Sequence, residues 1–280
     1  MKVDVVGSVS RLWRYPVKSM LGEEVESAKV VWSGFYGDRS YALVDVESSR
    51  LVSAKNPAKW ARMFECSSGL LGESESGGGA PLVHIVLPSG ERFDITDGNY
   101  GDTERAISAL FGRSVRFVAA RAEPRVSTIE LFHPEIAEDP DGGQTTKFVR
   151  ARDAQAGTFT DVAAIHLLTT ASLRTLTDIY PTGVFDTPRF RPNVLVDTGE
   201  AKGFVEDEWV GRVLALGDEV RLRIYKGCGR CVMTTLPQGG MPSDTGILRT
   251  VMKSNSGKLG VLASVQSGGM VKRGDQVVLM

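Results

Sequence analysis

The sequence predicts a mostly β protein of the α+β class, built in two parts. Short runs of alternating apolar and polar residues recur along the chain, and turns containing glycine or proline separate them. Few stretches show the 3.6-residue spacing of apolar side chains that indicates a helix. Residues 121–157 contain several prolines and glycines and little periodicity, so we expect a long linker between two halves.

The composition is that of an ordinary soluble protein. The chain has 280 residues, enough for one large domain or two of usual size, with 42% hydrophobic and 24% charged residues. A net charge of -1 offers no electrostatic case for a nucleic-acid or anionic-membrane partner. No apolar run has the length of a signal peptide or a membrane span. We therefore expect a cytoplasmic protein that binds neither nucleic acid nor membrane.

The first half begins with a strand at residues 3–14, which alternate loosely and end before Pro16. Strands at 24–32 and 39–46 follow around a glycine turn, and three such strands are typical of a meander or small barrel. The remaining predicted elements of this half are a short helix at 56–64, a hairpin of 84–87 with 91–95, a helix at 102–111 that stops at Gly112, and a strand at 115–118.

The second half contains strands with fewer helices. A helix from residue 169 or 170 to about 180 is expected because a threonine can cap its first turn. The other predicted elements are strands at 165–168, 194–197, within 213–225, 259–265 and 271–279, with an exposed Gly- and Pro-containing loop at 236–246.

The clearest chemical motif is residues 226–235, in which Cys228 and Cys231 stand three apart with Arg230 between them. A thiolate is a good ligand for a soft metal, and a neighbouring cation favours the deprotonated form. Neighbouring glycines let the backbone approach a ligand closely. This pattern predicts a metal thiolate at Cys231 and leaves the role of Cys228 open.

Four other interpretations apply to the same cysteines. A thioredoxin-like redox pair opens a helix, whereas the run after Cys231 favours an extended chain. A structural zinc site requires four ligands, and only Cys66 and three scattered histidines remain to complete one. A disulfide does not suit a cytosolic chain. The simplest alternative is a buried cysteine that packs as a small apolar residue.

Two further groups of polar residues lie beside predicted strands. Lys18, Ser19 and Arg39 fall at strand ends next to turns, and this combination suits an anion such as phosphate. Residues 189–193 place two arginines and Asn193 just before a strand, where they could clamp a ligand. In both groups the alternative is a solvated or salt-bridged surface charge.

These residues together resemble a known family. Tyr15-Pro16-Val17-Lys18-Ser19, Gly37-Asp38-Arg39, His166-Leu167-Leu168 through Ala171-Ser172-Leu173, Phe190-Arg191-Pro192-Asn193, and Gly229-Arg230-Cys231 with Thr234-Thr235 are similar in order and spacing to the MOSC-domain proteins. The resemblance covers nearly the whole chain and is greatest to the group that includes the mitochondrial amidoxime-reducing component. It implies an N-terminal β-barrel-like domain at 1–122 and a C-terminal MOSC β-barrel with a few helices at 123–280.

The resemblance also implies a pterin-based molybdenum cofactor, a molybdenum-molybdopterin, in the groove between the domains. By this match Cys231 supplies the thiolate to molybdenum and is the catalytic ligand. Lys18, Ser19 and Arg39 hold the phosphate end. Arg191 and Asn193 hold the pterin, with Arg230 and Asp161 close by. The cofactor then supplies the chemistry, and the protein orients and tunes it.

The implied activity is the reduction of N-hydroxylated compounds such as amidoximes. The chain ends without a cysteine after Cys231 and shows no membrane anchor, so we expect electrons from a separate flavin, haem or iron–sulfur protein. The segment after Thr235 departs from the family pattern, and the substrate-facing loop can differ. The alternative is a carrier of sulfur or of the cofactor that uses a persulfide on Cys231.

Overall fold

A computed structural model describes residues 4–72, 80–96, 98–120, 126–132, 146–152 and 157–280. It has two compact units, one formed by Met1–Arg14, Gly22–Asp38 and Val162–Met280, the other by Tyr15–Leu21 and Arg39–Asp161. We call them the barrel unit and the second unit. The predicted boundary after residue 122 is not one of the points at which the chain passes between these units, and it stays a prediction.

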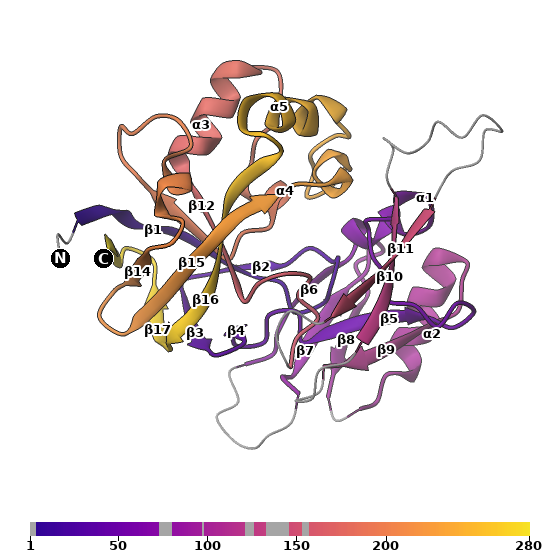
Figure 1. The fold of residues 1–280 in the computed structure, drawn as a ribbon. Helices are drawn as coiled ribbons and strands as arrows, with labels where there is room; N and C mark the ends of the chain where they lie inside the picture. The colour runs from indigo at the N-terminus through magenta and orange to yellow at the C-terminus, as the bar shows by residue number, and fades with distance from the viewer. Residues whose placement is uncertain (1–3, 73–79, 97, 121–125, 133–145, 153–156) are drawn as a thin grey trace. The chain divides into compact units, whose positions relative to one another are not determined.

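The barrel unit is built around a closed sheet of seven strands (Figure 1). Around the barrel they are β13 (Val194–Asp197), β12 (Ile165–Thr169), β16 (Lys258–Ser267), β15 (Val220–Gly229), β14 (Val213–Leu216), β18 (Gln276–Leu279) and β1 (Asp4–Arg14), and β1 pairs again with β13. Only β12 and β13 run parallel; the other neighbours in the barrel are antiparallel. The two ends of the chain thus complete one barrel, which leaves these strands without a free edge.

The barrel strands form because apolar and polar residues alternate along them. In β15, Val220, Leu222 and Ile224 are buried in the core cluster, whereas Arg223 and Tyr225, on either side of Ile224, are exposed. A period of two places successive side chains on opposite faces of a strand, so one face fills the barrel. Burying each such side chain contributes roughly 1.5–3 kcal/mol, which opposes the entropy lost in ordering the strand.

Smaller elements complete the barrel unit. They are β2 (Glu23–Val25), which pairs with β1, the sheet of β17 (Gly269–Lys272), β3 (Ser27–Val31) and β4 (Gly34–Phe35), and three helices, α3 (Thr170–Ile179), α4 (Thr187–Phe190) and α5 (Thr245–Asn255). Leu176 of α3 and Ile247 and Val251 of α5 share an apolar cluster with Phe190. Two 3-10 helices lie at Val205–Trp209 and Val232–Thr235.

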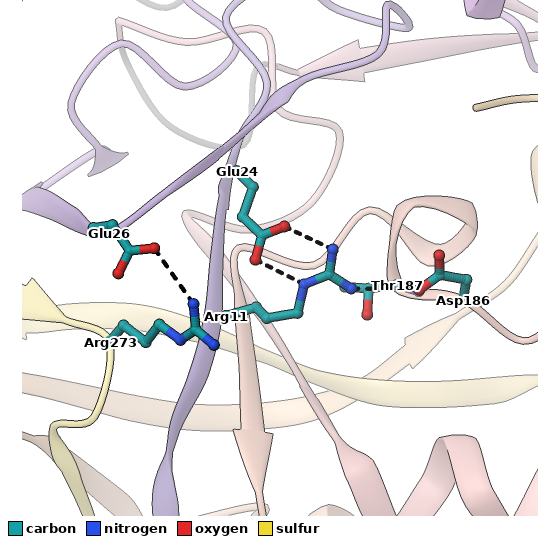
Figure 2. Close-up of polar contacts among 6 residues, drawn as sticks. All are labelled: Arg11, Glu24, Glu26, Asp186, Thr187 and Arg273. Atoms are coloured by element: carbon teal, nitrogen blue, oxygen red, sulfur yellow. Dashed lines mark hydrogen bonds and ion pairs between the residues drawn. The ribbon is translucent and has the colours of Figure 1, made fainter. Parts of the chain in front are cut away.

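Figure 2 shows how ion pairs connect β1 with its surroundings in the barrel unit. Arg11 of β1 donates two hydrogen bonds to the carboxylate of Glu24 in β2, at 2.8 and 2.7 Å, and lies 3.4 Å from Asp186 (Figure 2). The Asp186 carboxylate also accepts a hydrogen bond from the N–H of Thr187 and caps α4. Arg11 therefore helps to hold the start of the short helix that leads to Arg191.

In its described residues, the second unit contains small sheets and two helices. Its elements are the pair β5 (Tyr41–Asp45) and β9 (Val115–Ala119), the sheet β6 (Ser67–Leu70), β7 (Val83–Val86) and β8 (Arg92–Ile95), the pair β10 (Val126–Phe132) and β11 (Thr146–Arg152), the helices α1 (Pro57–Trp60) and α2 (Gly101–Phe111), and a 3-10 helix at Ala61–Glu65. Tyr41 stacks on Phe117 across β5 and β9, with ring centroids 4.9 Å apart.

The predicted fold class is confirmed, and most predicted elements occur within a few residues of their expected ends. α2 stops at Gly112, which adopts φ 61°, and Thr169 caps α3 by accepting a hydrogen bond from the N–H of Ser172. The linker predicted at 121–157 is wrong for β10 and β11, which pair along seven residues each. Its other residues, except Gly157, lie outside the described part of the chain.

The exposed loop predicted at 236–246 is followed by helix α5, which the sequence reasoning missed. Its signal is Asp244, whose carboxylate accepts a hydrogen bond from the N–H of Gly246, and the apolar pair Ile247 and Val251 four residues apart. The extended chain predicted after Cys231 is also wrong, since Val232–Thr235 is a 3-10 helix.

Candidate functional site

The cysteine motif lies at the end of β15, where the barrel ladder is irregular. The register between β15 and β16 shifts between Gly227 and Gly229, on either side of Cys228. Opposite, Gly260 has φ +77°, and a Cβ there would lie 2.4 Å from His166 Nε2. Only glycine therefore lets β16 approach His166 this closely. Irregular pairing of this kind redirects side chains and is frequent beside functional sites.

Local hydrogen bonds explain the turn that follows Cys231. The carbonyl of Cys231 accepts from both the N–H and the hydroxyl of Thr234, and the Thr235 hydroxyl donates to the carbonyl of Val232. Threonine side chains that bond to nearby backbone compete with an extended conformation. The Cys231 side chain thus stands at the start of a tight turn.

The three cysteines differ in exposure and environment. Cys228 and Cys231 are half-buried, whereas Cys66 in the second unit is buried, and all three are free thiols. Burial raises the pKa of Cys66 to about 12, so this thiol stays protonated. The two motif cysteines are therefore the candidates for thiolate chemistry, and Cys231 is not enclosed in apolar packing.

Cys228 has the environment of a thiolate. Burial raises its pKa, but interaction with His166 and Arg230 outweighs this effect and lowers the pKa to about 6. Arg230 Nη1 donates a hydrogen bond to Cys228 Sγ at 2.9 Å. At neutral pH this sulfur is therefore mostly ionised. The sequence pointed to Arg230 as a cation beside Cys231, and the structure directs the guanidinium to the other cysteine.

Arg230 also joins the cysteine motif to the segment before β13. Its Nη2 donates to the carbonyl of Phe190 at 2.7 Å, and the guanidinium lies 5.7 Å from the centre of the Phe190 ring. Its Nε is buried and has no hydrogen-bond partner among the described residues. A buried donor without a partner is costly, so this guanidinium has a position for a water molecule or a ligand atom.

Arg189 is a buried residue that also connects the segment before β13 with the residues that follow Cys231. It is 1% exposed, and its guanidinium donates to the carbonyls of Val184, Thr234, Leu236 and Pro242. The sequence placed this arginine among residues that could clamp a ligand. Because its donors are directed at the backbone on both sides, Arg189 instead fixes the segment that follows Cys231.

Asn193 is buried and bonded on every side of its amide. Its oxygen accepts from the N–H of His166 at 3.1 Å, and its nitrogen donates to the carbonyl of Trp13 and to the Asp38 carboxylate. The amide therefore ties β12, β1 and the turn after β4 together. Its predicted contact with the pterin stays a prediction.

The second unit gathers the other predicted residues. Lys18 Nζ donates to the Asp161 carboxylate at 2.5 Å and to the carbonyl of Phe159 at 2.9 Å, and Lys55 Nζ lies 2.8 Å from the other oxygen of Asp161. Burial would raise the pKa of Asp161, but the two ammonium groups hold it well below its usual range. Arg39 lies over the ring of Tyr15, 4.6 Å from its centre.

Three predicted site residues have an unusual backbone conformation. Among the described residues, the non-glycine positions with positive φ are Ser19 at 67°, Arg39 at 48°, Arg191 at 55°, Ser49 and Ser256. Arg191 ends α4 in the left-handed conformation, where glycine is usual. A non-glycine side chain in this region costs about 1 kcal/mol or more, and such strain gathers at functional sites.

The structure thus forms two clusters from the predicted residues, one in each unit. Arg191, Asn193, Arg230 and Cys231 belong to connected segments of the barrel unit, and Lys18, Ser19, Arg39 and Asp161 to the second unit. The sequence reasoning did not single out His166 or Lys55. His166 stood in a quoted motif without a role, and nothing local to Lys55 distinguishes it from a surface lysine.

The donor groups of the barrel unit are chemically compatible with a pterin-based molybdenum cofactor. Two half-buried thiols and the unpartnered Nε of Arg230 lie along one short segment. Gly229 is exposed, and a Cβ built on it would meet no heavy atom within 4 Å, so this side of the motif is open to solvent. Within the described ranges, no group of three or more His, Cys, Asp and Glu side chains could hold a metal ion by itself.

Comparison with known proteins identifies the family. A model described as the MOSC domain matches residues 154–278, and a model described as the MOSC N-terminal beta barrel domain matches residues 6–71. The mitochondrial amidoxime-reducing component 1 of Xenopus laevis is 27% identical over 97% of this chain and 82% of its own length. The protein of the same name from Homo sapiens is 25% identical over 98% of this chain and 83% of its own length.

Among solved structures, the YUAD protein from Bacillus subtilis aligns with a TM-score of 0.47 and 10% identity, over 99% of this chain and 97% of that chain. None of the helices in the described part of the chain has the length and apolarity that crossing a membrane requires.

Because the two family models match successive parts of the chain, the protein belongs to the MOSC-domain proteins with a MOSC N-terminal β-barrel domain, and it is similar to the mitochondrial amidoxime-reducing components.

Proposed function

We propose that this protein is a cytoplasmic oxidoreductase that depends on a molybdenum cofactor and reduces N-hydroxylated compounds such as amidoximes. The overall reaction takes two electrons and two protons, breaks the N–O bond and releases water. The electrons come from a separate flavin, haem or iron–sulfur protein. Similarity to the amidoxime-reducing components supports the substrate class.

The observation that carries this proposal is the environment of Arg230. Its guanidinium contacts the Cys228 sulfur and the Phe190 carbonyl, and its third nitrogen is buried without a partner among the described residues. A cation held between the Cys228 sulfur and the backbone, with one donor left over and the Cys231 thiol next to it in the chain, suits a polar ligand with a soft metal.

The residues have separate tasks in this proposal. Cys231 supplies the thiolate to molybdenum, and Arg191, Asn193 and Arg230 hold the pterin. Lys18, Ser19 and Arg39 hold the phosphate end, with Asp161 as their neighbour. When bound, the cofactor supplies two-electron redox chemistry at the metal. The chain itself orients the ligands: Arg189 holds the turn after Cys231 by its bonds to Thr234 and Leu236.

Metal and pterin analysis tests this function. Full-length protein from a host that makes the cofactor should contain molybdenum and pterin and should reduce a model amidoxime with a chemical electron donor. Cys231→Ala should lose activity and most of its molybdenum, because the metal loses its protein ligand. Cys231→Ser should show the same losses to a smaller extent, because it replaces only the sulfur by oxygen.

Cys228→Ser is the matched control, because it removes a thiol three residues away in the same motif. It should keep its molybdenum, which separates the ligand from its neighbour. Well-folded wild-type protein that contains neither molybdenum nor pterin would rule out the proposed function. Equal molybdenum in all variants would rule out Cys231 as the ligand.

A second candidate function is a carrier of sulfur or of the cofactor that uses a persulfide on Cys231. The observation that favours it is the neighbouring Cys228, whose low pKa of about 6 suits thiol exchange. Intact-protein mass spectrometry distinguishes the two functions. A mass increase of one sulfur on Cys231 without bound pterin would favour the carrier.

A further inference from the structure

Lys55 belongs to the cationic cluster of the second unit, although its sequence context predicts only a surface lysine. Asp161 uses one carboxylate oxygen for Lys18 and the other for Lys55, at 2.5 and 2.8 Å. The two lysines are therefore held on either side of a single carboxylate. Such a geometry brings two ammonium groups close together in spite of their repulsion.

Hydrogen bonds to the backbone also connect the two segments that carry Lys18 and Lys55. Ser19 Oγ, next to Lys18, accepts a hydrogen bond from the N–H of Ala54, next to Lys55, at 3.2 Å. The N–H of Lys55 in turn donates to Ser53 Oγ at 3.3 Å. The strained conformation of Ser19 thus serves to connect the two segments that carry the cations.

Exposure distinguishes the two lysines. The side chain of Lys18 is 6% exposed, whereas those of Lys55 and Asp161 are 21% and 30% exposed. Lys18 also donates to the carbonyl of Phe159, so two of the three N–H groups of its ammonium are hydrogen-bonded within the protein. An anion that reaches the cluster from solvent meets Lys55 more readily than Lys18.

The charges of the cluster favour an anion. Asp161, Lys55 and Arg39 are the charged groups that act on the Lys18 ammonium. Three cations and one carboxylate leave a net charge of 3 − 1 = +2. Clusters of this kind bind phosphate oxygens through charge-assisted hydrogen bonds.

We propose that Lys55 is a third cation that contacts the phosphate group held by this cluster, with Asp161 as the counterion that keeps Lys55 and Lys18 in place. The identity of the phosphate compound rests on the proposed function. The phosphate-binding site itself rests only on contacts within the second unit. The ligand chemistry is a phosphate monoester or free phosphate.

Inorganic phosphate is the probe, titrated into full-length protein made without the cofactor and followed by ³¹P NMR at low ionic strength. Lys55→Met should weaken phosphate binding about tenfold, since a hydrogen bond to a charged group is lost. Lys55→Arg keeps the charge and should stay within about threefold of the wild type. Lys59→Met removes the same charge four residues along the chain and should bind phosphate as the wild type does.

The double variant Lys55→Met with Asp161→Asn separates contact from charge, because it has the same net charge in the cluster as the wild type. Weaker phosphate binding in this variant than in Asp161→Asn alone supports a contact from Lys55, whereas equal binding in these two variants overturns it. Thermal unfolding confirms that each variant is folded. Should Lys55→Met fail to fold, Lys55→Gln carries the test, since it removes the same charge and leaves the Lys18–Asp161 pair intact.

The outcomes separate this inference from the proposed function. Unchanged phosphate binding in Lys55→Met, together with loss in Lys18→Met, overturns the role of Lys55 and leaves the molybdenum cofactor untouched. Absence of phosphate binding by the wild type also overturns it. Binding that depends on Lys55, in a protein that never acquires molybdenum or pterin, supports the anion site and ends the proposed function.

Discussion

At the scale of single residues, the two motif cysteines have different roles although they are three positions apart. Cys228 contacts Arg230 and lies beside His166, while Cys231 begins the turn that Thr234 closes. A positive neighbour favours the thiolate by direct attraction, so the orientation of one guanidinium decides which sulfur it affects. Spacing in the sequence shows that Arg230 is near both cysteines and leaves this choice open.

The ionisation of Cys228 gives a prediction at this scale. In cofactor-free Cys231→Ser protein, the rate of Cys228 alkylation by iodoacetamide should rise with pH around a midpoint of about 6. Adding Arg230→Met should move the midpoint upward by about one unit, because the thiolate loses a cation. Peptide mass spectrometry identifies the alkylated cysteine.

Arg223→Met is the control for this experiment. Arg223 is exposed on the same strand and donates to the carbonyl of Gly211, so its loss should leave the midpoint unchanged. A midpoint that stays in place in the Arg230 variant would show that Arg230 does not set the ionisation of Cys228.

At the scale of elements, the cysteine motif is positioned by the segments packed against it. α4 is only four residues long and cannot be stable by itself. Its capping residue Asp186 pairs with Arg11 (Figure 2). Arg189 within the helix donates to the carbonyls of Thr234 and Leu236. The helix and the turn after Cys231 therefore stabilise each other, and neither is determined by its own sequence.

Arg189 provides the prediction for this scale. Arg189→Met should lower the free energy of unfolding by about 3 kcal/mol, because four carbonyls, including the buried ones of Thr234 and Leu236, lose their donor. Amides of residues 234–242 should exchange with deuterium faster. Chemical denaturation and hydrogen exchange measure the two effects.

Arg174→Met is the matched control, since Arg174 also donates to two backbone carbonyls but is exposed on α3. It should change the stability by no more than about 0.5 kcal/mol. An equally small effect of Arg189→Met would contradict the role of Arg189 as the residue that holds this turn.

At the scale of the whole molecule, buried charge makes stability depend on pH. The pKa of Asp161 in the folded protein is held well below its usual range by Lys18 and Lys55, although burial opposes this. A carboxyl group with a lowered pKa stabilises the protein at pH values above the unfolded pKa of about 4. This stabilisation is lost progressively as the pH falls below that value.

The expected consequence concerns acid unfolding. Between pH 7 and pH 3, the loss of unfolding free energy should be smaller by roughly 1 kcal/mol in Asp161→Asn than in the wild type, because pH 3 lies about one unit below the unfolded pKa. At pH 7 Asp161→Asn should itself be less stable by about 3 kcal/mol, because the buried Lys18 ammonium loses its partner. Urea titrations at several pH values measure both.

Asp94→Asn serves as the control, because Asp94 pairs with Arg92 on the exposed hairpin of β7 and β8. Its loss should cost less than about 0.5 kcal/mol at pH 7. Parallel stability curves for wild type and Asp161→Asn across this pH range would contradict the account of the Lys18–Asp161 pair.

The sequence by itself determined the mostly β class, the position of most strands and the motif residues. These features depend on alternation, turn residues and caps, which act between neighbours in the chain. It also predicted that Lys18, Ser19 and Arg39 suit an anion and that Cys231 binds a metal, with Arg230 as the cation beside it. The helix α5 was missed, although Asp244 and the pair Ile247 and Val251 contain its local signal.

Only the tertiary structure decided which partners these residues have. The packed fold joins residues that are far apart or undirected in the sequence. It closes β1 onto β13 and β18, directs Arg230 to Cys228, buries Arg189 and pairs Lys55 with Asp161. A guanidinium or an ammonium group attracts any anion or carbonyl within reach, so its local sequence cannot select one. The barrel topology and the packed turns make that selection, because they determine which groups come within hydrogen-bond distance.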